Sequence, residues 1–112
     1  MEYINNIELQ GQVGQIRVTD WEGDRLASIS LKTERVWNNL YGTKEIETTW
    51  FQMQVCEGAL DLPRDLFDNI TNGDFIHVTG SLHFKKYFED GARIFPEVIV
   101  LTIEKVIPED HE

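Results

Sequence analysis

The stretch that decides the fold is Thr48-Thr49-Trp50-Phe51-Gln52-Met53-Gln54-Val55. Its apolar and polar side chains alternate with a period of two, which predicts a β-strand with one face toward a core and the other toward solvent. Phe51, Met53 and Val55 form the expected core face. Trp50 falls on the opposite face, beside two glutamines, where a soluble strand normally carries polar side chains.

Trp37 and Tyr87 repeat this placement in two other strand-like segments. The sequence therefore predicts three aromatic rings on one side of the protein. A large ring on a polar face is costly to leave in water unless a flat partner stacks on it, and nucleobases are flat partners. A single ring could instead pack beneath a loop or in a subunit interface, but three together favour a surface that binds bases.

The composition is that of one folded domain. The chain has 112 residues, of which 41% are hydrophobic, enough for a single modest core. Its first six residues carry neither a basic start nor an apolar run, so we expect no secretory signal and no membrane span. Cys56 is the only cysteine, which excludes an intramolecular disulfide and favours a reducing compartment. We expect a cytoplasmic protein, associated with the nucleoid if it binds DNA.

No pattern typical of an enzyme is readable. His77, His83 and His111 do not lie at metal-ligand spacing from Cys56. The segment Gly11-Gln12-Val13-Gly14 lacks the third glycine and the following helix of a dinucleotide site. We therefore expect no enzymatic activity, no metal and no cofactor.

The net charge of −10 opposes nucleic-acid binding, which is usually led by Lys and Arg side chains that neutralise phosphates. The charges are partly sorted, however. Acidic residues gather between residues 57 and 74 and at the C-terminus, whereas basic residues accompany the rings. Those basic residues are Lys32, Arg35, Lys44, Lys85, Lys86 and Arg93.

Five strands and one helix are predicted, with the strands over 7–18, 26–33, 48–55, 74–87 and 93–106 and the helix over 60–70. Gly11 and Gly14 within the first strand predict a bulge or sharp bend, and Gly80 predicts a pinched wall. The side chains expected to face the core from the later strands are Ala27, Ile29, Leu31, Ile76, Val78, Leu82, Phe84, Ile99, Leu101 and Ile103.

This order predicts an all-β fold, a five-stranded Greek-key OB-fold barrel with one short helix between the third and fourth strands. Residues 1–107 would form the OB-fold domain and residues 108–112 a short acidic C-terminal end. The barrel alone does not specify a function, because OB-folds bind proteins and sugars as well as nucleic acids.

Four motifs occur in order along the chain. They are Asn5-Asn6-Ile7-Glu8-Leu9-Gln10-Gly11-Gln12-Val13-Gly14, Ala27-x-Ile29-x-Leu31-x-Thr33 followed by Trp37, Thr49-Trp50, and Gly80-Ser81-Leu82 ahead of Tyr87. Over residues 5–106 the chain thereby resembles the bacterial single-stranded DNA-binding protein family, in a short form without the usual tail. The resemblance implies sequence-independent binding of single-stranded DNA in replication, recombination or repair, by a homo-oligomer (dimer or tetramer).

The resemblance also implies roles for individual residues. Trp37 and Trp50 match the family's base-stacking tryptophans, and Tyr87 takes the place of a third aromatic. Tyr41 and Phe88 are secondary stacking candidates in a flanking loop and hairpin. The implied phosphate partners are Arg35, Lys44, Lys85, Lys86 and Arg93.

The chain departs from the family at several places. Cys56 stands where a further stacking phenylalanine is usual, and Gln52 stands where Arg or Lys is common. The final residues, 107–112, are acidic but form no flexible linker with a terminal hydrophobic residue, so recruitment of replication or repair enzymes by a tail is not implied. We expect weaker and more salt-sensitive binding than in a typical member of the family. The alternative is a primosomal-type or mobile-element OB-fold accessory protein whose aromatic face mainly contacts protein partners.

Overall fold

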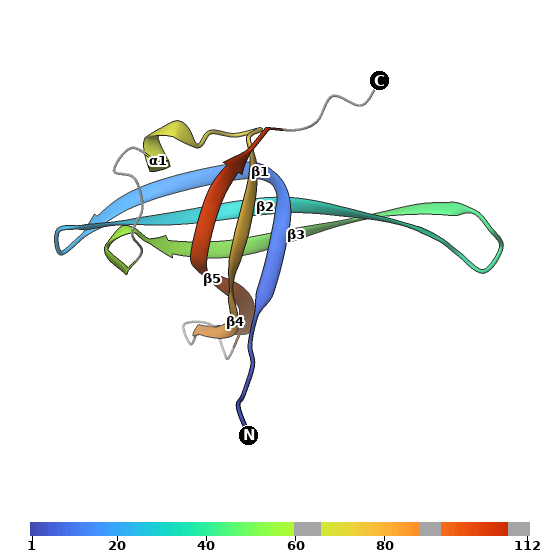
Figure 1. The fold of residues 1–112 in the computed structure, drawn as a ribbon, viewed down its shortest axis with the longest axis horizontal. Helices are drawn as coiled ribbons and strands as arrows, with labels where there is room; N and C mark the ends of the chain where they lie inside the picture. Colours follow the sequence, from blue (N-terminus) through green and yellow to red (C-terminus); the bar gives the residue numbers. More distant parts are fainter. Residues whose placement is uncertain (60–65, 88–92, 108–112) are drawn as a thin grey trace.

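The computed structural model describes residues 1–59, 66–87 and 93–107. Its five strands form a closed barrel in the order β1-β2-β3-β5-β4 (Figure 1). The elements are β1 (Ile7–Trp21), β2 (Asp24–Asn38), β3 (Lys44–Cys56), the 3-10 turn η1 (Glu57–Ala59), α1 (Leu66–Asn69), β4 (Phe75–Tyr87) and β5 (Arg93–Val106). A short helix lies between β3 and β4, so the predicted OB-fold is confirmed.

β1 closes the barrel because it pairs with two neighbours. Residues 7–12 pair antiparallel with β4, and residues 12–21 pair antiparallel with β2. A register shift between Val13 and Gln15 leaves Gly14 as a bulged residue, as the glycine spacing predicts. At Gly11 a Cβ atom would lie within 3.0 Å of the carbonyl carbon of Lys32, and closer to its oxygen. The two glycines therefore allow one strand to bend between two partners.

The core lies inside the barrel. Ala27, Ile29 and Leu31 on β2 are fully buried, as are Met53 and Val55 on β3. These positions confirm the alternation read from both segments. Phe51 packs against this core while staying partly exposed.

The predictions that Ile99 and Leu101 face the core are wrong, because the buried residues of this segment are Val98 and Val100. Thr79 pairs with Thr102 but Gly80 pairs with Val100, so a bulge leaves Leu101 without an opposite residue. The bulge reverses the alternation of β5, which turns Val100 and Ile103 inward and leaves Leu101 54% exposed.

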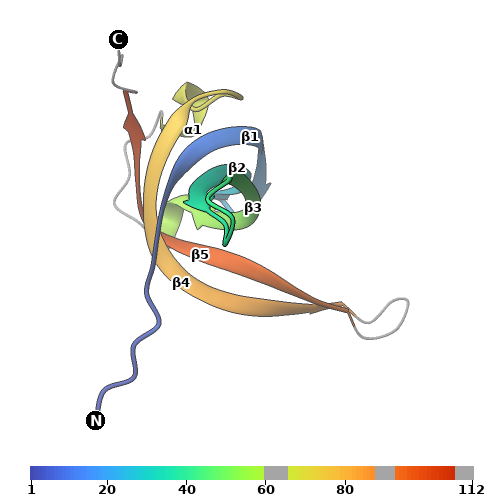
Figure 2. The ribbon, with the colours of Figure 1, turned by 90° about the vertical axis from the view of Figure 1, so that its right-hand side faces the viewer.

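The prediction that Phe84 faces the core is also wrong, because the ring is 60% exposed. Phe84 pairs with Pro96 in the outer part of the β4–β5 hairpin. This part of the hairpin projects away from the barrel (Figure 2). By alternation Phe84 lies on the same face of β4 as the buried Ile76 and Val78, but it lies in the part of the hairpin beyond the barrel, where no other strand covers that face.

The helix and the residue that follows it pack against the core through Phe67 and Ile70, which are 4% and 2% exposed. The part of the helix predicted over residues 60–65 lies outside the described residues. Arg25 at the start of β2 anchors this region, since its Nε donates to Glu57 at 2.7 Å and its Nη1 to Asp68 at 3.2 Å. The hydrogen bond to Glu57 is the largest of the interactions that raise the pKa of Arg25.

Within the described ranges, no helix is both long and apolar enough to cross a membrane.

Candidate nucleic-acid interface

The β2–β3 hairpin continues beyond the barrel as a free arm. The two strands pair from Leu26 with Cys56 to Asn38 with Lys44. β1 accompanies β2 only as far as Lys32, and β5 pairs with β3 only at two positions. Residues 33–49 therefore form a two-stranded ribbon that projects from the barrel, hereafter the β2–β3 arm (Figure 1). Both strands are longer than predicted. The prediction ended them too early because the arm has no core face, so the hydrophobic alternation on which the prediction relied stops there.

A tight turn at Asn39 shapes the tip of the arm. Asn39 Oδ1 accepts hydrogen bonds from the backbone N–H groups of Tyr41 at 2.9 Å and Thr43 at 3.0 Å. Gly42 adopts a φ of 77°, which favours glycine at this position. The Tyr41 side chain is 91% exposed, and Lys44 is exposed where β3 begins. The turn thus holds a ring and a cation at the end of the arm.

Trp50 lies at the base of the arm and is 55% exposed. The outer edge of its indole reaches across β2 to Gly14 on β1, where an added Cβ would lie 2.8 Å from Cη2. The same Cβ would lie 3.1 Å from Ser30 Oγ. The edge of the indole therefore occupies space that a side chain at position 14 would fill, while much of the residue stays exposed.

Trp37 lies farther out on the arm and is 41% exposed. The Arg35 guanidinium carbon lies 5.7 Å from the centre of its indole, within cation–π range. Arg35 thereby places a positive charge next to the indole.

Trp37 and Trp50 lie on opposite faces of the β2–β3 ladder, which corrects the prediction that the rings share one side. Trp50 pairs with Lys32. Trp37 is the fifth residue after Lys32 on the same strand, and the pairing between the two positions is continuous. Since successive side chains of a strand point to opposite faces, the two indoles leave opposite faces of the ribbon. A nucleic acid that contacts both must follow the twist of the ribbon or cross its edge.

The remaining predicted contacts lie on the other hairpin. Tyr87 pairs with Arg93 at the outer end of the β4–β5 ladder, next to the pair of Lys86 with Ile94 and then the pair of Lys85 with Phe95. This hairpin leaves the barrel in a different direction from the β2–β3 arm (Figures 1 and 2). Phe88 lies outside the described residues. The predicted site residues thus fall into two groups, with Arg35, Trp37, Tyr41 and Lys44 on one arm and Lys85, Lys86, Tyr87 and Arg93 on the other.

Acidic residues dilute the positive charge of the β2–β3 arm. Glu34, Glu45 and Glu47 are all exposed on it. Glu34 lies 3.6 Å from the ammonium group of Lys32, and Glu45 accepts a hydrogen bond from Asn39 at 2.9 Å. The positive charge of Lys32, Arg35 and Lys44 is therefore largely offset by neighbouring carboxylates.

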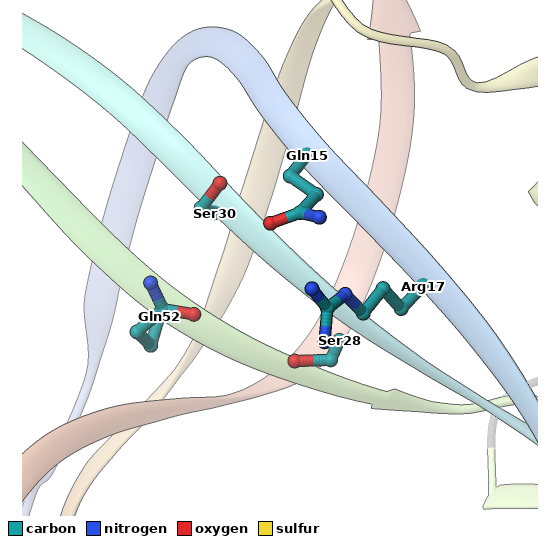
Figure 3. A pocket seen from close by; sticks show the side chains of 5 residues that line it. All are labelled: Gln15, Arg17, Ser28, Ser30 and Gln52. Carbon is teal, nitrogen blue, oxygen red and sulfur yellow. The ribbon is translucent and has the colours of Figure 1, made fainter.

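A polar pocket lies beside Trp50 on the outer face of β1, β2 and β3. It is lined by Gln15, Arg17, Ser28, Ser30 and Gln52 (Figure 3). Alternation along β2 and β3 predicts that the serines and Gln52 face outward. The contribution of β1 was missed, because the bulge at Gly14 shifts the phase of the strand and only the register shows that Gln15 meets Ser30.

Beyond this pocket, a chain of hydrogen bonds crosses to β5 and β4. Gln54 Nε2 donates to Ser28 Oγ at 3.4 Å and to Glu97 Oε2 at 3.3 Å, and His83 Nε2 lies 2.8 Å from Glu97 Oε1. Glu97 is 8% exposed, so these partners compensate for the cost of burying a carboxylate. Among the described residues, no group of three or more His, Cys, Asp or Glu side chains is arranged to hold a metal ion.

No protein-family model and no curated protein matches this sequence. Solved structures do match. Plasmodium falciparum SSB in complex with ssDNA superposes with a TM-score of 0.82 at 25% identity, over 96% of this chain and 98% of that chain.

Two bacterial structures share the fold at lower identity. A deletion mutant of the single-stranded DNA-binding protein from Thermus aquaticus has a TM-score of 0.75 at 15% identity, over 93% of this chain and 51% of that chain. The small single-stranded DNA-binding protein from Streptomyces coelicolor has a TM-score of 0.72 at 16% identity, over 96% of this chain and 97% of that chain. Taken with the closed barrel and its strand order, these likenesses show that the chain has an OB-fold similar to that of these single-stranded DNA-binding proteins.

Proposed function

We propose that the chain binds single-stranded DNA without regard to sequence and without enzymatic activity. The observation that carries the proposal is the indole of Trp50, which is 55% exposed and rests against Gly14 at the base of the β2–β3 arm. Every base has a π-face, so stacking on such a ring contributes affinity without reading sequence. Trp37, backed by Arg35, supplies a second platform on the opposite face of the ladder.

Phosphate contacts come from both hairpins in this proposal. Arg35 and Lys44 serve the strand along the β2–β3 arm, with Tyr41 as a further stacking ring at the tip. On the other hairpin, the proposed stacking residues are Tyr87 and Phe88 and the proposed phosphate partners are Lys85, Lys86 and Arg93. A single strand that engages both hairpins would pass around the barrel.

Such a protein would protect exposed strands during replication, recombination or repair, at the nucleoid of its cell.

We also propose that it assembles as a homo-oligomer. Residues 7–11 of β1 pair with β4 on one edge, while the pairing of β1 with β2 begins at residue 12. An open strand edge of this kind is a common place for subunits to meet.

Intrinsic tryptophan fluorescence during titration with an oligo-thymidine strand tests the proposal. We expect saturable quenching at low salt, because stacked bases quench the indoles, and a weaker association at moderate salt. A duplex of the same length serves as the control, since its bases are not available for stacking. Absence of quenching by the single strand at low salt would refute the proposed function.

A second candidate function is supported by exposed aliphatic side chains on the same arm. Val36 pairs with Ile46, and the two are 54% and 63% exposed. Leu40 at the tip is 99% exposed. Aliphatic groups do not stack on bases, and such a patch is typical of a protein contact. An OB-fold accessory protein of the primosomal or mobile-element type would use the arm in this way, and it would bind a protein partner in place of the oligonucleotide.

A further inference from the structure

The outer face of β1, β2 and β3 carries a set of hydrogen-bonding side chains in register. Gln15 pairs with Ser30, and Ser30 pairs with Gln52 on its other side. Gln52 follows Trp50 by two positions on the same face, a distance of roughly 7 Å along a strand. Arg17 and Ser28 pair in the next row and complete the lining of the pocket (Figure 3). A base that stacks on Trp50 would therefore present its edge to this pocket.

The Gln15 amide is oriented by Arg17. With the amide turned by half a rotation from the orientation drawn in Figure 3, its oxygen accepts from Arg17 Nε and Arg17 Nη2, both at 3.2 Å. The Gln15 NH2 group then points away from Arg17. Since a guanidinium has donors only, the β1 side of the pocket offers hydrogen-bond donors.

The rest of the lining is neutral. Ser28, Ser30 and Gln52 can each donate or accept, and two of the donors of Arg17 are directed at Gln15. Amides, hydroxyls and arginines bond to phosphates as well as to base edges, so the residue types alone do not choose between the two. The position of the pocket favours a base edge, because Gln52 lies two positions from Trp50 on the same face, where the edge of a base stacked on Trp50 would lie.

We propose that this pocket is a base-edge subsite, which prefers the carbonyl oxygen of a keto base, thymine or guanine, stacked on Trp50. The inference rests on the proposed function, since it needs a bound single strand. Donors from Gln15 and Arg17 bond to the carbonyl at O4 of thymine or O6 of guanine. Cytosine and adenine carry an amino group at that place, which is itself a donor and leaves donor facing donor. Binding would thus be general for single strands, with a modest preference at one position.

The test compares oligo-thymidine and oligo-cytidine strands of equal length by tryptophan quenching at one salt concentration. Stacking strength and backbone flexibility also differ between the two strands, but they are the same for the wild-type protein and its variants, so the change of the ratio on substitution reports the edge contact. We expect the wild-type protein to bind oligo-thymidine more tightly, with an edge contribution of about threefold to tenfold, the range that one hydrogen bond provides. Gln15→Ala should lower the ratio of the two dissociation constants by that factor, chiefly by weakening oligo-thymidine.

Gln10→Ala is the matched control, because Gln10 is also an exposed glutamine on β1 but lies in the part paired with β4 and does not line this pocket. It should leave the ratio at its wild-type value. If Gln15→Ala fails to fold by circular dichroism, Ser30→Ala replaces it, with the same expected fall in the ratio. Arg17→Gln should also lower the ratio, because it releases the Gln15 amide.

Three results would overturn the inference while leaving the proposed function intact. They are equal wild-type affinities for the two strands, an unchanged ratio in Gln15→Ala, or an Arg17→Gln variant that weakens both strands equally and reduces the salt dependence. The last result would identify the pocket as a phosphate contact. If the wild-type protein binds neither strand, the proposed function fails together with the subsite.

Discussion

The indole of Trp50 lies against Gly14, two strands away across the sheet. A Cβ atom at position 14 would lie 2.8 Å from Cη2 of the indole and closer still to Cζ3. Gly14 is also the bulged residue at which β1 shifts register against β2. The same glycine therefore serves the barrel, by allowing the bend, and the candidate site, by leaving space that the edge of the indole occupies.

Gly14→Ala should weaken single-strand binding with little loss of stability. The atoms that the new methyl group meets belong to the end of a side chain, so the indole moves while the backbone stays. We expect affinity to fall by about threefold to tenfold, part of the 1–3 kcal/mol that stacking of one base contributes. Quenching titrations and a thermal melt measure the two effects. In a Trp50→Ala background the glycine substitution should have no further effect on binding, and an additive loss would contradict the mechanism.

Replacing both exposed indoles should remove most of the affinity. Each stacked base contributes about 1–3 kcal/mol, so Trp37→Ala combined with Trp50→Ala should weaken binding by about tenfold or more. Fluorescence anisotropy of a labelled oligonucleotide measures this without relying on the tryptophans. Leu101→Ala is a control that removes an exposed apolar side chain outside the site. A folded double variant with wild-type affinity would show that the stacking assignment is incorrect.

Gly80→Ala should destabilise the barrel without a direct effect on the site. A Cβ at position 80 would lie 3.0 Å from the carbonyl carbon of Ile99 and closer to its oxygen. Both atoms belong to the backbone of the paired strand, so the bulge must open, at a cost of about 1–3 kcal/mol. Chemical denaturation measures the loss. Gly14→Ala provides the comparison, since its obstruction is a side chain, and equal stabilities of the two variants would contradict this reasoning.

Asp74 should make stability depend on pH in the acid range. The backbone N–H of Thr71 donates to its Oδ2 at 2.9 Å, and the Lys105 ammonium lies 3.3 Å away. These contacts, with the Thr71 hydrogen bond first, lower the pKa of Asp74 below its ordinary value. A carboxyl whose pKa is lowered by folding stabilises the folded state above its unfolded pKa of about 3.9, and this contribution is lost as pH falls below that value.

Asp74→Asn should therefore cost about 0.5–1 kcal/mol at neutral pH and much less below about pH 3. Urea denaturation at several pH values checks the trend. Glu47→Gln provides a matched carboxyl-to-amide control at an exposed position of the arm. A stability difference between wild type and Asp74→Asn that does not change with pH would contradict the assignment.

Lys44→Gln should reduce the salt dependence of binding. Lys44 is exposed at the start of β3, near the tip of the arm, where a phosphate can approach it. Loss of one phosphate contact lowers the slope of log affinity against log salt by up to about 1. Lys105→Gln is the control, because its ammonium group already donates to the Asn69 carbonyl at 2.9 Å, near the helix. Identical slopes for both variants and the wild-type protein would exclude Lys44 from the phosphate contacts.

The sequence predicts the barrel well where alternation is strict and poorly where a bulge intervenes. Ala27, Ile29 and Leu31 lie inside as predicted, because their strand is regular and one of its faces is buried. Leu101 does not, since an unpaired residue on β5 reverses the phase and nothing in the apolar pattern marks the place. The fully buried core of β4, Ile76 and Val78, follows the prediction, whereas Phe84 leaves the barrel with its hairpin.

The sequence by itself determined the number and order of the strands, the closed barrel and the outward placement of Trp50, because local alternation and glycine spacing carry that information. Tertiary structure alone decided which outward residues meet. Strand register brings Gln15 to Ser30, sets Trp50 against Gly14 and puts Trp37 on the opposite face of the ladder. These relationships depend on pairing between segments distant in the chain, and a shift of one residue in that pairing exchanges the two faces of a strand.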